Sequence, residues 1–177
     1  MKTSSDYTQL CRLLGELPGV GSNAAERMAE WLIHHGPRTE LEVVLNGIND
    51  AGVCTGCNRL MSRSGCSGCG QADPDSSVLL VCATEKDLRA INDATEFAGP
   101  VFVLHGELSP SRNIGPAQLQ LDKLAIRINE IDPPCVAIAV SASVEGRATA
   151  EFIFRKTGRS GHSGSVEEVI QWLRSRD

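Results

Sequence analysis

Residues 78–104 read VLLVCATEKDLRAINDATEFAGPVFVL, and this stretch decides the fold class. Its two ends, residues 78–83 and 101–104, are short and almost wholly apolar, which is typical of buried strands. The polar stretch between them carries apolar side chains at helical spacing. A third apolar run, CVAIAV at residues 135–140, follows a second helical stretch at residues 117–130. Because strands and helices alternate in this way, we predict an α/β domain whose parallel sheet has helices on both faces.

Upstream of this stretch the sequence predicts three helices. Residues 5–14 place leucines at helical spacing, and the turn-forming sequence GELPGVG follows at residues 15–21. A second helix, capped by Ser22 or Asn23, follows the turn, and residues 39–49 form a third. The first two helices and the turn between them make a helix-hairpin-helix unit.

Downstream of the third strand the sequence predicts a helix over residues 147–156. The Gly/Ser-rich sequence TGRSGHSGS follows, and we interpret it as a flexible linker. The last residues, VEEVIQWLRSRD, have the spacing of an amphipathic helix. These elements divide the chain into four predicted parts: a helix-hairpin-helix region (1–52), a four-cysteine zinc region (53–72), the α/β domain (76–157), and a linker with a C-terminal helix (158–177).

Four of the seven cysteines follow the pattern C-x2-C-x8-C-x2-C, namely Cys54, Cys57, Cys66 and Cys69. Each pair lies in a tight turn whose glycine lets two thiolates point at one ion. Four cysteines are the ligand set of a structural zinc ion and leave no position for water or substrate, so we predict one structural Zn²⁺. Two disulfides or four free thiols are the alternatives. The other three are interpreted as packing residues: Cys11, Cys82 and Cys135.

Composition restricts the classes of function. The chain of 177 residues is 41% hydrophobic and carries a net charge of −5, and it has no run of about 18 apolar residues that could span a bilayer. Its first residues, MKTSSDYTQLCRLL, lack the apolar core of a signal peptide, so we expect a cytoplasmic protein whose thiols stay reduced. The acidic balance means that any DNA binding is local, weak or strengthened by oligomerisation.

The hairpin contains residues that suit contact with a DNA backbone. Gly19 and Gly21 let the main chain approach a phosphate, with the amides at the start of the second helix pointing outward. Arg27, one turn into that helix, is placed to contact a second phosphate, whereas Asn23 offers only a neutral hydrogen bond. The alternative is a helical hairpin that serves packing alone.

The LPGVG hairpin, the cysteine spacing, and the sequences LSPSRNIGP and SVEGRATA occur in a fixed order along the chain. In this combination they resemble the bacterial RecR family of recombination mediators, from about residue 8 to residue 155. The resemblance implies a helix-hairpin-helix, a zinc knuckle and a Toprim domain. It also implies a non-enzymatic, clamp-like oligomer that works with RecO and RecF to load the recombinase RecA onto gapped DNA coated by single-strand-binding protein.

The resemblance also assigns residues, and the chain departs from the family pattern in several places. It places zinc on the four cysteines and DNA contact on the hairpin at Gly19 and Gly21 and on Arg27. Asn23 stands where family members commonly have a Lys that helps to hold DNA, which should weaken binding and flatten its salt dependence.

Three further departures lie in the Toprim-like domain. Ala83 replaces an acidic residue, His105 replaces a Gly, and Arg112 with Asn113 replaces an Asp-Gly pair. After Phe154 the family normally has another strand and an acidic loop that help to join its members into a ring, whereas we expect only the linker here. We therefore expect a dimer or a partner-dependent assembly in place of the ring.

The Toprim-like domain lacks the residues of a metal-dependent enzyme. Such an enzyme holds Mg²⁺ with a Glu after its first strand and an Asp-x-Asp pair after a later one. Here Ala83 takes the first position, with Glu85 two residues on, and the later loop reads SAS at residues 141–143. Asp73 and Asp75 precede the first strand and are interpreted as part of a turn. We therefore predict that the protein is not an enzyme.

Glu145 and Gly146 retain the family pattern after the third strand and are our candidates for contact with a partner protein. The alternative is a carboxylate that stabilises a helix start. Three functions follow. The first is a DNA-binding mediator that acts with RecO-like and RecF-like proteins, and the second is an interaction module, of mobile-element or phage type, that modulates a host RecR-like oligomer. The third is a metal-dependent Toprim nuclease.

Overall fold

The computed structural model of the chain describes residues 5–17, 19–61, 65–66, 68–69, 72–73 and 76–176. The side chains of residues 5 and 48–51 are not described. It divides into two compact units, Met1–Asp50 and Ala51–Asp177, and each is described by itself. None of the helices in the described ranges has the length and apolar character needed to cross a bilayer.

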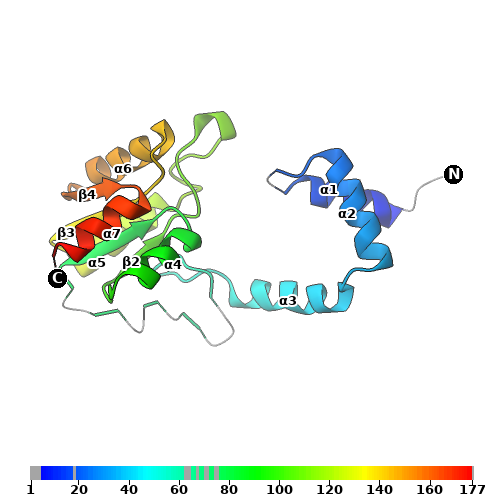
Figure 1. Cartoon of the computed structure of the whole chain (residues 1–177), viewed down its shortest axis with the longest axis horizontal. Helices are drawn as coiled ribbons and strands as arrows, with labels where there is room; N and C mark the ends of the chain where they lie inside the picture. The colour runs from blue at the N-terminus through cyan, green and yellow to red at the C-terminus, as the bar shows by residue number, and fades with distance from the viewer. Residues whose placement is uncertain are drawn as a thin grey trace. The chain divides into compact units, whose positions relative to one another are not determined.

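The N-terminal unit is helical. α1 (Ser5–Gly15) packs against α2 (Ser22–His34), and α3 (Arg38–Ala51) follows (Figure 1). These helices match the three predicted ones to within two residues at each end. The predicted cap of α2 is wrong, because Ser22 is already helical and Gly21 is the N-cap, whose carbonyl accepts the Ala25 amide at 2.9 Å. No N-cap side chain therefore covers the first amides of α2.

The N-terminal unit has almost no core of its own. Among its described side chains, only Ala25 and Ala29 are buried. Large apolar side chains lie at its surface instead, and the exposed fraction of Trp31 is 55%. The exposed set includes Leu13, Met28, Trp31, Val43, Val44 and Leu45. Two alanines bury too little apolar area to hold three helices together, since stability follows the apolar area removed from water.

The C-terminal unit contains a four-stranded parallel sheet of order β2-β1-β3-β4 (Figure 1). Its strands are β1 (Val78–Cys82), β2 (Val101–Val103), β3 (Cys135–Ala139) and β4 (Gly161–Gly164). Every residue of β1 and β2 is buried, as the nearly continuous apolar runs predicted. The predicted α/β fold with a parallel sheet is confirmed.

Helices cover both faces of this sheet, because successive strand residues point to opposite faces. α4 (Glu85–Ala94) and α7 (Val166–Arg174) pack with Leu80 on one face. α5 (Leu121–Ile131) and α6 (Val144–Thr157) pack on the other face. The second face buries large side chains from the sheet and from α5 and α6: Leu79, Val81, Phe102, Leu124, Ile138 and Ile153. The loop between β2 and α5 carries a short 3-10 helix, η1 (Pro110–Arg112).

The segment interpreted as a flexible linker contains a strand, so that prediction is wrong. β4 pairs in parallel with β3, and the Val140 amide donates to the Gly164 carbonyl at 2.9 Å. A Cβ added at Gly161 would lie 1.9 Å from the carbonyl oxygen of Val136, so glycine is required where the two strands approach. The residues of β4 alternate between exposed and half-buried. An edge strand of Gly, His and Ser has no apolar run that sequence analysis could detect.

Candidate metal centre and the pocket at the strand ends

The four cysteines of the predicted zinc site lie together. Their Sγ atoms are all within 4.8 Å of one another. Cys54 Sγ is 3.7 Å from Cys69 Sγ, and Cys57 Sγ is 3.3 Å from Cys66 Sγ. Sulfurs bound tetrahedrally at about 2.3 Å from a zinc ion are about 3.8 Å apart, so this donor set fits the ion. No disulfide joins any of the seven cysteines, so the alternative of two disulfides is not seen, and four free thiols stay the other alternative.

Short turns of the backbone place these sulfurs. The Cys69 amide donates to Cys66 Sγ at 3.4 Å. Burial pushes the pKa of the Cys66 thiol upward, but the amides of Cys69 and Gly68 and the Cys57 thiol outweigh it and lower this pKa to about 7. At Cys57 burial dominates and raises the pKa. The hydrogen bonds to Cys66 thus favour its thiolate, which is the form that binds metal.

The segment from Cys54 to Cys69, here called the knuckle, pairs with the edge of β2. The Val103 amide donates to the Cys57 carbonyl at 3.0 Å, and Asn58 Nδ2 donates to the Val103 carbonyl at 2.6 Å. Asn58 is buried at a φ of 57°, a left-handed conformation that Asn adopts more readily than most residues. The knuckle therefore satisfies hydrogen-bonding groups that an edge strand would otherwise leave open.

Two departures from the family pattern occupy left-handed backbone positions. His105 has a φ of 59° and Asn113 a φ of 55°, at positions where the family resemblance predicts Gly. Gly takes this conformation without strain, and Asn tolerates it better than other residues. His105 uses its ring, since Nε2 donates to the Asn58 carbonyl at 2.6 Å. The His therefore gives the knuckle a contact that Gly could not make.

Glu85, the carboxylate closest in sequence to the missing ligand at Ala83, points at the knuckle. Its Oε2 lies 3.1 Å from Arg59 Nε, and its Oε1 accepts the Leu60 amide at 3.2 Å. Both charged side chains are 24% exposed. Glu85 begins α4, as predicted, but it holds the knuckle and is not among the residues that line the pocket described next.

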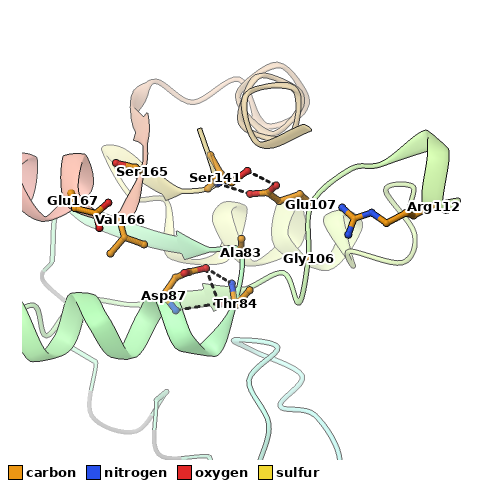
Figure 2. Close-up of a pocket in the computed structure, with 11 residues that line it drawn as sticks. Ala83, Thr84, Asp87, Gly106, Glu107, Arg112, Ser141, Ser165, Val166 and Glu167 are labelled. Carbon is orange, nitrogen blue, oxygen red and sulfur yellow. Dashed lines mark hydrogen bonds between the residues drawn. The ribbon is translucent and has the colours of Figure 1, made fainter. Parts of the chain in front are cut away.

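A pocket of about 470 Å³ lies at the carboxyl ends of the strands (Figure 2). Ala83 follows β1, Val140 follows β3, and Ser165 follows β4 and caps α7. Arg112 and Glu167 also line it. Ligands of open parallel sheets commonly bind at this edge, because the loops that follow the strands are free to vary there.

Two carboxylates of this pocket are hydrogen-bonded to its own walls (Figure 2). Glu107 accepts the Ser141 amide at 2.5 Å and the Ser141 hydroxyl at 2.8 Å. Asp87 accepts the Thr84 amide at 3.0 Å and completes a capping box at the start of α4. In the described part of the chain, only the four cysteines form a group of metal-ligating side chains. Asp75 lies outside the described residues.

Glu145 and Gly146, the partner candidates, begin α6. Ser143 caps this helix by accepting the Gly146 amide at 3.0 Å. A Cβ on the buried Gly146 would lie 2.1 Å from the Ser141 carbonyl oxygen, so Gly146 is needed for this loop to close. Glu145 is half-buried in the first turn of α6. The structure thus gives Gly146 a structural role, and the contact with a partner stays a prediction.

The predicted DNA-contact residues lie together at the start of α2. Gly19 has a φ of 81°, and no atom lies within 4 Å of a Cβ built at Gly19 or Gly21. Asn23 and Arg27 are exposed and four residues apart, which places them on one face of the helix. The first turn of α2 has no acidic residue. Pro18 of the hairpin lies outside the described residues.

The contacts that hold the knuckle on the sheet were not predicted from the sequence. Arg59 and Asn58 fall between the cysteine pairs, where charged and polar residues are ordinary loop residues. Their partners, Glu85 and Val103, lie 26 and 45 positions further along the chain. Only the buried position of Asn58, which a sequence does not reveal, distinguishes it from a solvated side chain.

The match to known domain families defines the class of protein. Residues 77–166 match the Toprim domain family, which is more than half of the chain and includes all four strands. The fold and the site thus define a Toprim-domain protein that carries a four-cysteine cluster docked on the edge of its sheet.

Curated relatives identify the family. The chain is 35% identical over 151 residues to "Recombination protein RecR" of Heliobacterium modesticaldum, which covers 83% of this chain and 75% of that protein. It is 35% identical over 162 residues to the RecR of Thermus thermophilus, covering 91% and 82%, and 32% identical over 156 residues to that of an Anaeromyxobacter species, covering 86% and 79%. The chain belongs to the RecR family of recombination proteins.

Proposed function

We propose that this protein is a DNA-binding mediator of recombination and repair that acts with RecO-like and RecF-like proteins at gapped DNA and performs no chemistry itself. The observation that carries the proposal is the state of the pocket at the strand ends. A Toprim enzyme needs free carboxylates there for Mg²⁺. Here Ala83 stands at the end of β1, and two of the three carboxylates that line the pocket, Glu107 and Asp87, are hydrogen-bonded to its walls, which leaves Glu167 as a single carboxylate where Mg²⁺ needs several.

The start of α2 supports the DNA contact. Its first amides have no side-chain cap, and no carboxylate lies in its first turn, so the positive end of the helix dipole is available to a phosphate. Gly19 and Gly21 leave open space for the approach of a backbone. Arg27 supplies a cation, and Asn23 supplies a neutral donor one turn earlier.

The four cysteines support one structural zinc ion. With four thiolates the coordination sphere is complete, so the ion would hold the knuckle against β2 and would offer no position to a substrate. The distances between the sulfurs fit this role, and Val103 and Asn58 tie the knuckle to the sheet.

The exposed apolar surface of the N-terminal unit supports self-association, as a dimer or a higher oligomer. A unit whose described side chains bury only Ala25 and Ala29 gains stability when a second copy covers Met28, Trp31 and the valines of α3. Oligomerisation would also bring several copies of Arg27 to one DNA molecule, which offsets the acidic net charge.

The experiment that tests this function is fluorescence anisotropy with zinc-loaded protein and labelled single-stranded, duplex and gapped DNA over a salt series. We expect binding that Arg27→Ala removes and that Asn23→Lys strengthens, with a log-log salt slope on duplex DNA steeper by about 0.9 for the added charge. Arg155→Ala is the matched control, because Arg155 is exposed on α6 in the other unit. Absence of binding to every DNA by folded, zinc-loaded protein, including Asn23→Lys, would contradict the proposal.

The same apolar surface favours a second candidate, an interaction module that pairs with a host RecR-like protein and changes its assembly. In that case the N-terminal unit would be completed by the host protein. Co-expression of the two chains with one affinity tag would distinguish the candidates. Mixed oligomers that Trp31→Ser disrupts would support the module, and two proteins that always separate would exclude it.

A further inference from the structure

Two arginines lie against two of the glycines of the knuckle. Each cysteine pair has a glycine directly before its second cysteine, Gly56 in one and Gly68 in the other. A Cβ built on Gly68 would lie 3.0 Å from Arg59 Nη1, and one built on Gly56 would lie 3.9 Å from Arg127 Cζ. Each turn of the metal site is therefore backed by a guanidinium group.

The two arginines come from different parts of the unit. Arg59 belongs to the knuckle and is held by Glu85 at the start of α4, on one face of the sheet. Arg127 belongs to α5, on the opposite face, and its Nη1 lies 3.3 Å from Glu130 Oε2. One cation of this pair is thus held by the start of α4 and the other is carried by α5, on opposite faces of the sheet.

Arg127 has a polar atom that the surrounding protein leaves unused. Its Nε is buried and has no hydrogen-bond partner, although the side chain as a whole is 26% exposed. A Cβ built on Gly56 would be close to this guanidinium and to two of the cysteine sulfurs. Its distances would be 3.9 Å to Arg127 Cζ, 3.2 Å to Cys69 Sγ and 3.9 Å to Cys54 Sγ. Burying a donor without a partner costs free energy, and negatively charged thiolates near Arg127 Nε would offset that cost.

The net charge of the proposed zinc centre accounts for the two arginines beside the cysteines. A zinc ion with four thiolates carries a net charge of −2, and a half-buried site screens that charge less than water does. We propose that Arg59 and Arg127 are the counterions of this centre, and that they hold the metal and reduce the reactivity of its thiolates. The proposal rests on the zinc ion proposed above. Residues outside the ligand set commonly change metal affinity by a factor of about 10 to 100.

The test measures how fast the full-length protein releases its metal. Zinc content is determined first, and hydrogen peroxide is then added with a chromogenic zinc chelator present. We expect Arg127→Gln to release zinc about 10-fold faster than the native protein, Arg127→Lys to stay close to the native rate, and Arg59→Gln to accelerate release as well. Arg155→Gln, at an arginine of α6 that is 77% exposed and pairs with Glu151, is the matched control and should leave the rate unchanged.

A second measurement separates a charge effect from loss of structure. The cobalt(II) form of each variant shows a sulfur-to-metal charge-transfer band, and loss of a counterion should shift this band while the tetrahedral d–d bands persist. Release by Arg127→Gln at the native rate, or equal acceleration by Arg127→Lys and Arg127→Gln, would overturn the counterion role. A native protein without bound zinc would overturn the zinc proposal itself, so the two failures are distinguishable.

Discussion

The two units of this protein differ in what holds them together. The C-terminal unit buries complete layers of large side chains on both faces of its sheet, including Phe102, Ile138 and Leu88. The N-terminal unit buries only Ala25 and Ala29 among its described side chains. The C-terminal unit can therefore fold on its own hydrophobic core, whereas the N-terminal unit leaves its large apolar side chains exposed.

The difference teaches where to look for function in each unit. In the C-terminal unit two carboxylates at the strand ends, Glu107 and Asp87, are hydrogen-bonded within the protein. In the N-terminal unit both the apolar helix faces and the uncapped start of α2 are open. The proposed association with another chain and the proposed contact with DNA both rely on the N-terminal unit, whose own interactions are incomplete.

The largest expected effect is loss of core packing in the C-terminal unit. Phe102 is fully buried in β2, and Phe102→Ala should lower the free energy of unfolding by about 3–5 kcal/mol, since it removes buried area and leaves a cavity. Urea unfolding followed by circular dichroism measures this change. The control is Val144→Ala at a side chain that is 72% exposed, which should cost little. Equal losses for both variants would mean that this unit has no such core.

A smaller effect is expected where the knuckle joins the sheet. Asn58→Gly keeps the left-handed backbone but leaves the buried Val103 carbonyl without its donor, which should cost about 1–3 kcal/mol. Amide hydrogen exchange should show faster exchange at Val103, whose amide bonds to the knuckle. The Leu104 amide bonds to the Cys82 carbonyl inside the sheet and serves as the control. Unchanged protection at Val103 would disprove the docking contact.

The cap of α7 should contribute less again. Ser165 accepts the Glu168 amide, and Glu168 accepts the Ser165 amide, so Ser165→Ala should cost about 1 kcal/mol. The Ser165 amide and hydroxyl lower the pKa of Glu168. Because the pKa of Glu168 is lower in the folded state, its carboxylate stabilises the fold at any pH above its unfolded pKa of about 4.3. This stabilisation is lost as the pH falls through the pKa of Glu168 in the folded state.

The pH dependence of unfolding checks this cap. The difference in stability between the native protein and Glu168→Gln should therefore be full at pH 7 and should shrink as the pH falls below about 4. Glu167→Gln, at the neighbouring carboxylate outside the capping box, is the control. A difference that does not change with pH would rule out an ionised Glu168 as part of the cap.

The smallest effect on monomer stability is expected in the N-terminal unit. Trp31 is 55% exposed, so Trp31→Ser removes little buried area and should change the free energy of monomer unfolding by less than about 0.5 kcal/mol. Its effect should appear in sedimentation velocity, as a shift toward smaller species. A large loss of monomer stability with no change in assembly would mean that Trp31 belongs to a core of the N-terminal unit and not to a surface between copies.

The four-cysteine cluster and strands β1, β2 and β3 were predictable from the sequence because each depends on neighbours along the chain. The four cysteines follow a spacing that two turns dictate, and the apolar runs of β1, β2 and β3 report their own burial. β4 was not predictable, since Gly161–Gly164 has no apolar pattern and becomes a strand only because β3 offers a free edge. The cap of α2 was misplaced by one or two residues, because Ser22 and Asn23 favour a cap position and also tolerate the first helical turn.

The sequence by itself determined the class of fold, the cysteine ligand set and the absence of a carboxylate at Ala83, because these are properties of local pattern and residue type. Only the tertiary structure decided that Glu85 holds Arg59, that Glu107 closes on Ser141, and that two arginines back the metal site. Such contacts join residues that are far apart in the chain. They depend on the register of the sheet and on the helices that cover it, and no local pattern encodes either.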